Sequence, residues 1–423
     1  MSGKPALLLL AAVSLAAACS GAGVGGGDGA SGTIEFHFWG EQEEVVIYDS
    51  VIAAFEREHA DLEVRLTPVA DRDEYLQKLT TSMAAGNPPD VFLLNFRFFS
   101  QFVARGGIEP FGPHAPDLGV HTADYYEPPI EAFTYDGELQ CMPQNISSLV
   151  VYYNRRSFED AGIQEPSPGW TWESFRDTAR ALTKGDVRGL GIDPNVIRVA
   201  PFVWSNGGEI VDDLETPTRF TLDRSDSREA LEFIVGMVRE GLVPTEQEIA
   251  AQDLETRFMA GKLGMLLSSR RETPAFREVV GLDFDVAPLP VGEEPAGILH
   301  SDAYCVARGS DDISAAMEFT AFAVGPQGQR ITALGGRTVP SLEEVATSPA
   351  FLDPTQPPSR SQVFLDGIPT IGRTPVIPTW PEIEDVVAEI LTRMFYEPDY
   401  TVERGIEEID DLTRDLLAEG SAS

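Results

Sequence analysis

TIEFHFW, residues 33–39, begins the part of the chain that sets its architecture. Ile34, Phe36 and Phe38 alternate there with polar residues, which predicts a strand with one buried face. Similar patterns then predict a helix, a strand, a second helix and a buried strand, over residues 43–58, 62–68, 73–85 and 91–94. This β-α-β-α-β order implies a largely parallel sheet with helices on its faces. Functional sites in such sheets gather at the carboxyl ends of the strands, here residues 39–42 and 95–97.

The rest of the chain continues this mixture of strands and helices. Strand patterns cover residues 140–153, 263–267, 284–289 and 297–307. Helical patterns cover residues 172–182, 228–240, 255–260, 314–323, 326–334, 383–396 and 402–417. With 423 residues, the chain is too long for one ordinary core and suits two lobes. We therefore expect an α/β protein of two lobes.

The N-terminal residues look like a bacterial lipoprotein signal. A short basic start and an apolar run make residues 1–18 a signal peptide, because the run is too short for a membrane span. Small residues precede Cys19, although Leu15 lies one place earlier than is usual. We expect a lipidated Cys19 and a glycine-rich tether over 19–32, so that the protein is secreted across the cytoplasmic membrane and anchored at its outer face, in the periplasm or at the cell surface. The alternative is an ordinary cleavage site nearby and an unmodified Cys19.

Charge and motifs exclude several classes of function. The chain has 31 basic and 68 acidic residues, a formal charge of −37, which disfavours nucleic-acid binding. It contains no phosphate-binding loop, no His-Glu-x-x-His, no Gly-x-Ser-x-Gly and no Cys-x-x-Cys, and its five histidines are dispersed. We therefore predict no catalytic residue, no metal site and no cofactor, and a monomer by default.

Cys141 and Cys305 are the two remaining cysteines. In an oxidising compartment an even pair permits a disulfide, and two buried free thiols are the alternative.

Several phrases of the sequence are also recognisable together. They are Phe38-Trp39-Gly40, SMAAGNPPDV (82–91), VYYNRRSFEDAGI (151–163), GWTWESF (169–175), WSNGG (204–208), FMAGKLGM (258–265), APLP (287–290), AAMEF (315–319) and GGRTVP (335–340). In this order, over nearly the whole mature chain, they resemble the family 1 extracellular solute-binding proteins of ABC importers, the maltose-binding-protein-like, sugar-type group.

The resemblance implies a two-lobed periplasmic-binding-protein fold of type II, with a ligand cleft between the lobes and a hinge that the chain crosses more than once. Lobe 1 would comprise residues 33–141 plus 302–345, and lobe 2 residues 142–301 plus 346–423. Cys141 and Cys305 would then both lie beside hinge crossings. Binding in such a cleft couples ligand capture to closure of the lobes.

Nine residues are candidate ligand contacts. Trp380 matches a family position whose aromatic ring packs on a sugar, and Trp39 and Trp204 are further aromatic candidates. Short polar side chains at strand ends or hinge crossings could bind hydroxyl groups, although each is also a common turn or cap residue; these are Glu41, Asn95, Asn145 and Asp302.

The last two candidates are arginines. Arg97 is expected in a loop where relatives place charged contacts, and Arg271 stands where sugar-binding members usually have an aromatic residue. Together with Arg337 they would suit an acidic ligand, unless they pair with local acids such as Glu272.

These observations predict a lipoprotein that binds a sugar or oligosaccharide and delivers it to the permease subunits of an ABC importer. The alternatives are a receptor for an anionic ligand (uronate, sugar phosphate or glycerol-phosphate type), a sensor subunit for a membrane kinase, and an extracytoplasmic carbohydrate-active enzyme. The enzyme would need a close pair of carboxyl groups with different pKa values in the cleft.

Overall fold

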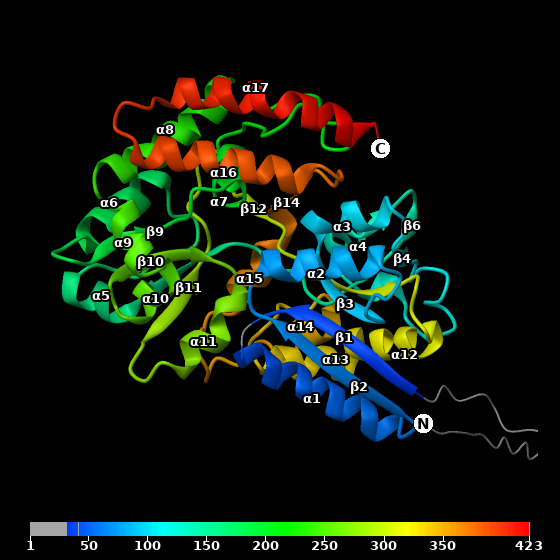
Figure 1. Ribbon diagram of the computed structural model, residues 1–423. Coiled ribbons are helices and arrows are strands. Elements are labelled where there is room, and N and C mark those ends of the chain that lie inside the picture. The colour runs from blue at the N-terminus through cyan, green and yellow to red at the C-terminus, as the bar shows by residue number, and fades with distance from the viewer. Residues whose placement is uncertain (1–31, 41, 423) are drawn as a thin grey trace, which may run out of the picture.

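The computed structural model describes residues 32–40 and 42–422, which form two α/β lobes (Figure 1). Lobe 1 is built on a six-stranded sheet of order β2-β1-β3-β13-β4, with β7 paired to β13. Its strands are β1 (Gly32–Trp39), β2 (Leu62–Val69), β3 (Val91–Asn95), β4 (Ile108–Glu109), β7 (Met142–Pro143) and β13 (Asp302–Ala307). β1 pairs in parallel with β2 and β3, and β13 is antiparallel to β3. The predicted parallel β-α-β-α-β order is therefore present, and a strand from much later in the chain completes the sheet.

The helices of lobe 1 cover this sheet. They are α1 (Gln42–Glu58), α2 (Arg72–Ala84), α3 (Phe96–Val103), α4 (Glu127–Ala132), α12 (Ile313–Val324), α13 (Pro326–Leu334) and α14 (Glu343–Ala346); a small hairpin of β5 (Thr134–Tyr135) and β6 (Glu138–Leu139) follows α4. Asp71 caps α2 by accepting from the backbone N–H of Glu74, and Asn95 caps α3 through the N–H of Arg97. The strand-end residue Asn95 is thereby held at the edge of the sheet.

Lobe 2 has a four-stranded sheet of order β11-β8-β10-β9. Its strands are β8 (Val150–Asn154), β9 (Arg188–Gly191), β10 (Leu263–Ser268) and β11 (Phe284–Ala287). Its helices are α5 (Arg155–Ala161), α6 (Trp172–Leu182), α7 (Val196–Ser205), α8 (Ser225–Arg239), α9 (Glu246–Ala251), α10 (Leu254–Met259), α11 (Thr273–Glu278), α16 (Trp380–Tyr396) and α17 (Val402–Ser421). β9 and β10 are parallel, so both end at the same edge of the sheet. The segments that follow them carry the charged residues of the site described below.

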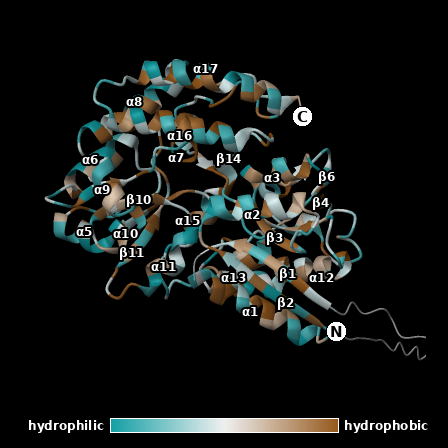
Figure 2. Cartoon of the chain, viewed as in Figure 1, coloured by the Kyte–Doolittle hydropathy of each residue, from teal (hydrophilic) through white to brown (hydrophobic). Residues whose placement is uncertain are grey.

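Two apolar clusters fill the interior of the molecule. The first contains Phe36 and Tyr304 of lobe 1 and continues to one face of the lobe 2 sheet at Tyr152, and the second contains Val151 and Met265 of lobe 2. In Figure 2, α16 and α17 alternate hydrophobic and hydrophilic stretches, as helices with one buried face do. Among the residues described, no helix combines the length and apolarity needed to cross a membrane.

The chain passes between the lobes three times, which agrees with a hinge of several crossings. The first crossing joins β7 to β8, and the second joins β12 (Gly297–Ile298) to β13. These two crossings pair with each other, since Ser147 and His300 form a bridge. The third crossing leads from α14 through α15 (Gln362–Asp366) and β14 (Ile371–Gly372) to α16. The residue numbers assigned to the two lobes remain a prediction.

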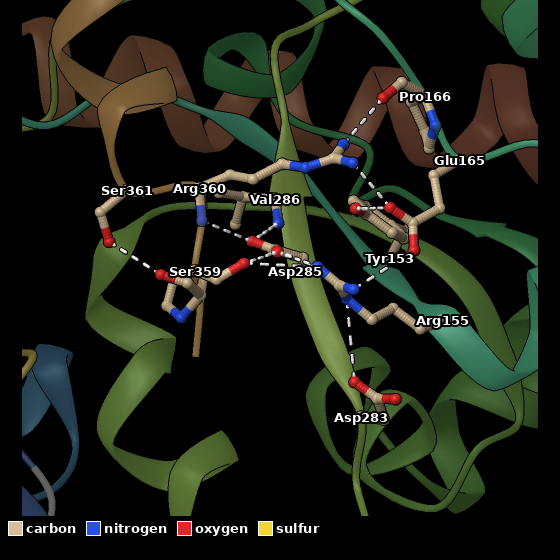
Figure 3. Close-up of polar contacts among 11 residues, drawn as sticks. Tyr153, Arg155, Glu165, Pro166, Asp283, Asp285, Val286, Ser359, Arg360 and Ser361 are labelled. Carbon is tan, nitrogen blue, oxygen red and sulfur yellow. Dashed lines mark hydrogen bonds and ion pairs between the residues drawn. The ribbon is translucent and has the colours of Figure 1, made fainter. Parts of the chain in front are cut away.

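The third crossing is fastened to lobe 2 by a polar network (Figure 3). Asp285 of β11 is fully buried, pairs with Arg155, and accepts from the hydroxyl of Ser359 at 2.5 Å and the backbone N–H of Arg360 at 3.0 Å. The Arg360 guanidinium in turn donates to Glu165 at 2.7 Å. Because every member has a partner, the network fixes the position of this segment.

Two predicted strands are divided in the structure, and one prominent helix was missed. The strand expected over 140–153 is divided into β7 and β8, and that over 297–307 into β12 and β13, because the chain passes from one lobe to the other within each. α7 was not predicted, since it is apolar on all sides and contains Pro201, so that no helical period is visible in its sequence.

Candidate ligand site between the lobes

The lobe 1 side of the site lies where β3 ends and β13 begins. Asn95 and Asp302 are register partners on these antiparallel strands, and the Asn95 amide donates to Asp302 at 3.0 Å. Both line a small pocket together with Trp39, Phe98 and Arg337. The structure therefore brings three of the predicted residues, Trp39, Asn95 and Asp302, to one place.

Buried charges of opposite sign lie beside this pocket. Glu44 of α1 and Arg337 form an ion pair in which each side chain is only 5% exposed, and Arg337 also lies 3.5 Å from Asp302. Burial lowers the pKa of Arg337, but the charge of Glu44, followed by Tyr48 and Asp302, outweighs it and raises the pKa above its usual value. Arg337 is thus permanently charged and compensated.

Arg271 of lobe 2 reaches across to this group. Its guanidinium lies 4.0 Å from the ring centroid of Trp39 and 3.5 Å from Glu44. This contact is the first polar bridge between the lobes. The sequence placed Arg271 at the ligand site, and the structure pairs it with an acid of the opposite lobe rather than with Glu272.

Arg97 and Glu384 form a second bridge, from α3 to α16. Their side chains are 2.6 Å apart and only 13% and 11% exposed. The expectation that Arg97 lies in a loop is wrong, because Asn95 caps a helix there and Arg97 lies in its first turn. Glu384 also accepts from the indole N–H of Trp380 at 2.8 Å. The Trp380 ring itself is fully buried and stacks on Phe220, so its contact with a ligand stays a prediction.

The lobe 2 side holds a set of titratable side chains. They are Arg198 of α7, Glu255 of α10, Glu272 after β10 and His300 after β12. Burial, and then the charges of Arg198 and Arg97, hold the pKa of His300 well below its usual value, so that its imidazole is neutral. Burial, followed by the charges of Glu272 and Asp193, raises the pKa of Glu255 to about 7. Burial likewise raises the pKa of Glu272. Glu255 is therefore partly protonated near neutral pH.

The remaining candidates lie apart from these bridges or outside the described residues. Asn145 donates to the His300 carbonyl and accepts from the Asp302 N–H, which joins two hinge crossings. Trp204 packs against Gly372 and lines a pocket of about 760 Å³ on lobe 2. Glu41 and Cys19 lie outside the described residues.

The two cysteines are joined in the structure. Cys141 and Cys305 form a disulfide that links the segment before β7 to β13 within lobe 1. That this bond forms in the protein in solution stays a prediction.

Another pocket, of about 470 Å³, opens between the lobes. Its lining includes Glu131, Thr134, Tyr135 and Asp136 from lobe 1 and Glu215, Arg373, Ile377 and Ser421 from lobe 2. The lining is rich in groups that hydrogen bond to hydroxyls. It provides space between the lobes beyond the two bridges.

Sequence reasoning missed Glu44, Arg198, His300 and Glu384 as site residues. Glu44 and Glu384 lie in ordinary amphipathic helices, and Arg198 lies in the helix that went unrecognised. Nothing in their local sequence marks them. Within the part of the chain that the structure describes, no group of three or more metal-binding side chains is placed to hold an ion.

Comparison with known proteins gives a consistent result. Residues 50–357 match the family described as bacterial extracellular solute-binding protein. The chain is 23% identical over 320 residues to the diacetylchitobiose binding protein DasA of Streptomyces coelicolor, covering 73% of this chain and 72% of that protein.

Solved structures show the same fold. The ABC substrate-binding protein Lmo0181 of Listeria monocytogenes, in complex with cycloalternan, superposes with a TM-score of 0.84 at 23% identity, over 92% of this chain and 99% of that one. UgpB of Mycobacterium tuberculosis, in complex with glycerophosphocholine, superposes with a TM-score of 0.80 at 21% identity, over 92% of this chain and 99% of that one. These are two-lobed binding proteins rather than enzymes. Since the family match covers most of its length, the chain belongs to the bacterial extracellular solute-binding proteins.

Proposed function

We propose that the protein binds a neutral sugar or oligosaccharide between its lobes and delivers it to the permease of an ABC importer. Its similarity to the diacetylchitobiose binding protein DasA supports a carbohydrate ligand. The cleft also offers the groups that such a ligand needs, an aromatic ring at Trp39 and hydroxyl-binding side chains at Asn95 and Asp302.

The ion pairs of the cleft arginines are the observation that favours a neutral ligand over an anionic one. An anionic ligand is bound by positive charge that the protein itself does not neutralise. Arg97 is paired with Glu384, Arg271 with Glu44, and Arg337 with Glu44 and Asp302. These three arginines therefore hold the lobes and the site together and are not reserved for a uronate or a phosphate.

Anchoring and assembly complete the proposal. Residues 1–18 would be removed on secretion, lipidated Cys19 would hold the protein at the outer face of the membrane, and residues up to Gly32 would act as a tether. β1 begins at Gly32, directly after this segment. The protein would act as a monomer that meets its permease, without binding nucleic acid.

A thermal-shift screen of the purified protein tests the proposal. The panel contains neutral mono- and oligosaccharides, the corresponding uronates, sugar phosphates and sn-glycerol 3-phosphate. A ligand at about 100 times its Kd should stabilise the folded state by about 2.7 kcal/mol. Stabilisation by neutral sugars, with the sugar recovered unchanged, is the expected result. Stabilisation by anions alone would contradict it.

A further inference from the structure

Arg198 is a buried arginine whose guanidinium group uses only part of its hydrogen-bonding capacity. It lies in the first turn of α7, where Asn195 caps the helix by accepting from its backbone N–H. Its side chain is 10% exposed, and Asp193, its ion-pair partner, is 3.6 Å away, beyond hydrogen-bond distance. Among the described residues, the buried Nε and Nη1 of Arg198 have no hydrogen-bond partner. Native structures rarely leave such donors unpaired, because each costs free energy.

His300 presents a second unpaired atom at the same interface. Its Nε2 is buried and has no hydrogen-bond partner among the described residues. His300 lies in the second crossing between the lobes, between β12 and β13, where its backbone pairs with Ser147. Helix α7, which carries Arg198, packs against β12 at the start of this crossing. A neutral imidazole nitrogen either accepts or donates one hydrogen bond.

Glu255 and Glu272 supply acceptors nearby. Both lie within electrostatic reach of Arg198, which lowers the pKa of each. Because Asp193 already forms an ion pair with Arg198, and Glu255 and Glu272 also interact with its charge, a further anion would meet repulsion there. A hydroxyl group both donates and accepts, and it brings no charge.

The geometry points to a subsite on the lobe 2 side of the cleft, in which Arg198 and His300 bind adjacent hydroxyl groups of a neutral sugar. This inference rests on the proposed function, and it names the residues on the lobe 2 side that would bind the sugar. Arg198 differs from the other cleft arginines, because two of its donors are unpaired. Arg97 and Arg271 hydrogen-bond to carboxylates of the opposite lobe, and Arg337 lies in close contact with Glu44.

Arg257 provides a matched control. Its side chain is 6% exposed, and its guanidinium donates to the backbone carbonyls of Glu248 and Asp186. It is therefore as buried as Arg198, and its Nε is likewise unpaired, but its two other nitrogens both donate to backbone carbonyls of lobe 2. Comparing the two arginines distinguishes a ligand-binding role from a structural one.

The first measurement needs no sugar. Thermal unfolding of Arg198→Met and Arg257→Met is compared at pH 5.5, where Glu255 is protonated and does not depend on the charge of Arg198. We expect Arg198→Met to melt at the same temperature as the unchanged protein or higher, because unpaired donors are removed, and Arg257→Met to melt lower. An Arg198→Met variant that melts as low as Arg257→Met would overturn the inference.

The second measurement uses glucose, maltose, maltotriose, trehalose and diacetylchitobiose as calorimetric probes. For a sugar that binds, Arg198→Met should weaken the affinity at least tenfold and Arg257→Met less than twofold. Analogues lacking one hydroxyl should lose affinity toward the unchanged protein but not toward Arg198→Met. Equal affinity of Arg198→Met and the unchanged protein would overturn the subsite. If no neutral sugar binds the unchanged protein, the proposed function fails, and with it the sugar as occupant of this subsite.

Discussion

Charged residues in the cleft form ion pairs with residues from distant parts of the chain. Glu44 and Arg337 illustrate the cost of this arrangement, since each is almost fully buried. Removing two charges from water costs about as much as their attraction returns, so such a pair contributes little net stability. Losing one partner is different, because the other charge then remains buried without compensation.

Replacement of Arg337 by methionine should therefore destabilise the protein by about 3–5 kcal/mol. Urea unfolding followed by circular dichroism measures the change. Arg414→Met is the control, because Arg414 is 55% exposed and pairs with Asp410 on the surface of α17, where about 0–1 kcal/mol is expected. Equal losses in the two variants would contradict the role given to the buried pair.

Glu255 gives a pH-dependent prediction. Since burial raises its pKa to about 7, the folded state holds a proton that the unfolded state releases near its model value of 4.5. Its ionisation therefore lowers stability as pH rises from about 4.5 to 7. Glu255→Gln should be more stable than the unchanged protein at pH 7.5 and equally stable at pH 4.5, as measured by urea midpoints. A constant difference between the variants across this range would contradict the raised pKa.

Among the elements, the third crossing and β11 show how a loop is held without regular structure. Asp285 lies on a strand of lobe 2, whereas Ser359 and Arg360 arrive from lobe 1 (Figure 3). One buried carboxylate thus serves two donors of the crossing and Arg155. This carboxylate and the packing of the buried Phe351 and Phe364 together hold the crossing.

Asp285→Asn should destabilise the protein by about 3 kcal/mol, because it removes the charge that compensates Arg155 in a buried network. The neighbouring Asp283 is a matched control, since it is 68% exposed and lies 3.8 Å from Arg155. Asp283→Asn should change the free energy of unfolding by less than about 0.5 kcal/mol. Urea unfolding measures the free energy of unfolding of both variants. Equal losses in the two variants, or a larger loss in Asp283→Asn, would contradict the prediction.

The disulfide between Cys141 and Cys305 acts on the pairing of β7 with β13. It closes a loop with a sequence separation of 164 residues, so it restricts the unfolded chain strongly. The double variant Cys141→Ala, Cys305→Ala should lose about 3–5 kcal/mol in urea unfolding. Labelling of the unreduced, unfolded protein with iodoacetamide is the direct check. Modification of both Cys141 and Cys305 would show that the two thiols are free and would contradict the predicted disulfide.

In the molecule as a whole, two bridges between acidic and basic side chains join the facing lobes, Arg97–Glu384 and Arg271 with Trp39 and Glu44, beside backbone contacts such as that of Arg270 with Gly336. Both bridges span the space between the lobes, and both would break if the lobes moved apart. A two-state hinge responds to the energy of such contacts, because each contact stabilises only the closed arrangement.

Glu384→Gln should therefore shift the sugar-free protein towards a more open form. Small-angle X-ray scattering should report a larger radius of gyration than for the unchanged protein. Glu382→Gln, on an exposed position of the same helix, is the control and should leave the radius unchanged. An identical radius for all three proteins would show that this ion pair does not hold the lobes together.

The sequence by itself determined the elements whose signals are local. The predicted bounds of α6 and α13 agree with the structure to the residue, because Thr171 forms a capping box at the start of one and Pro326 occupies the first turn of the other. The α/β class and the two-lobed fold followed from such patterns and from the resemblance to a family. Such signals depend only on residues that are close together in the sequence.

Tertiary structure alone decided the charges of the site. Arg97, Arg271 and Arg337 suggested an acidic ligand as long as they were considered singly, and their acidic partners lie in α1, β13 and α16, far away in the chain. Trp380 suggested a sugar-stacking ring, and the fold buries it against Phe220. Periodicity depends on adjacent residues, whereas compensation of charge depends on which segments meet when the lobes fold. For this reason the sequence identified the class of protein, and only the folded chain showed which groups are left for a ligand.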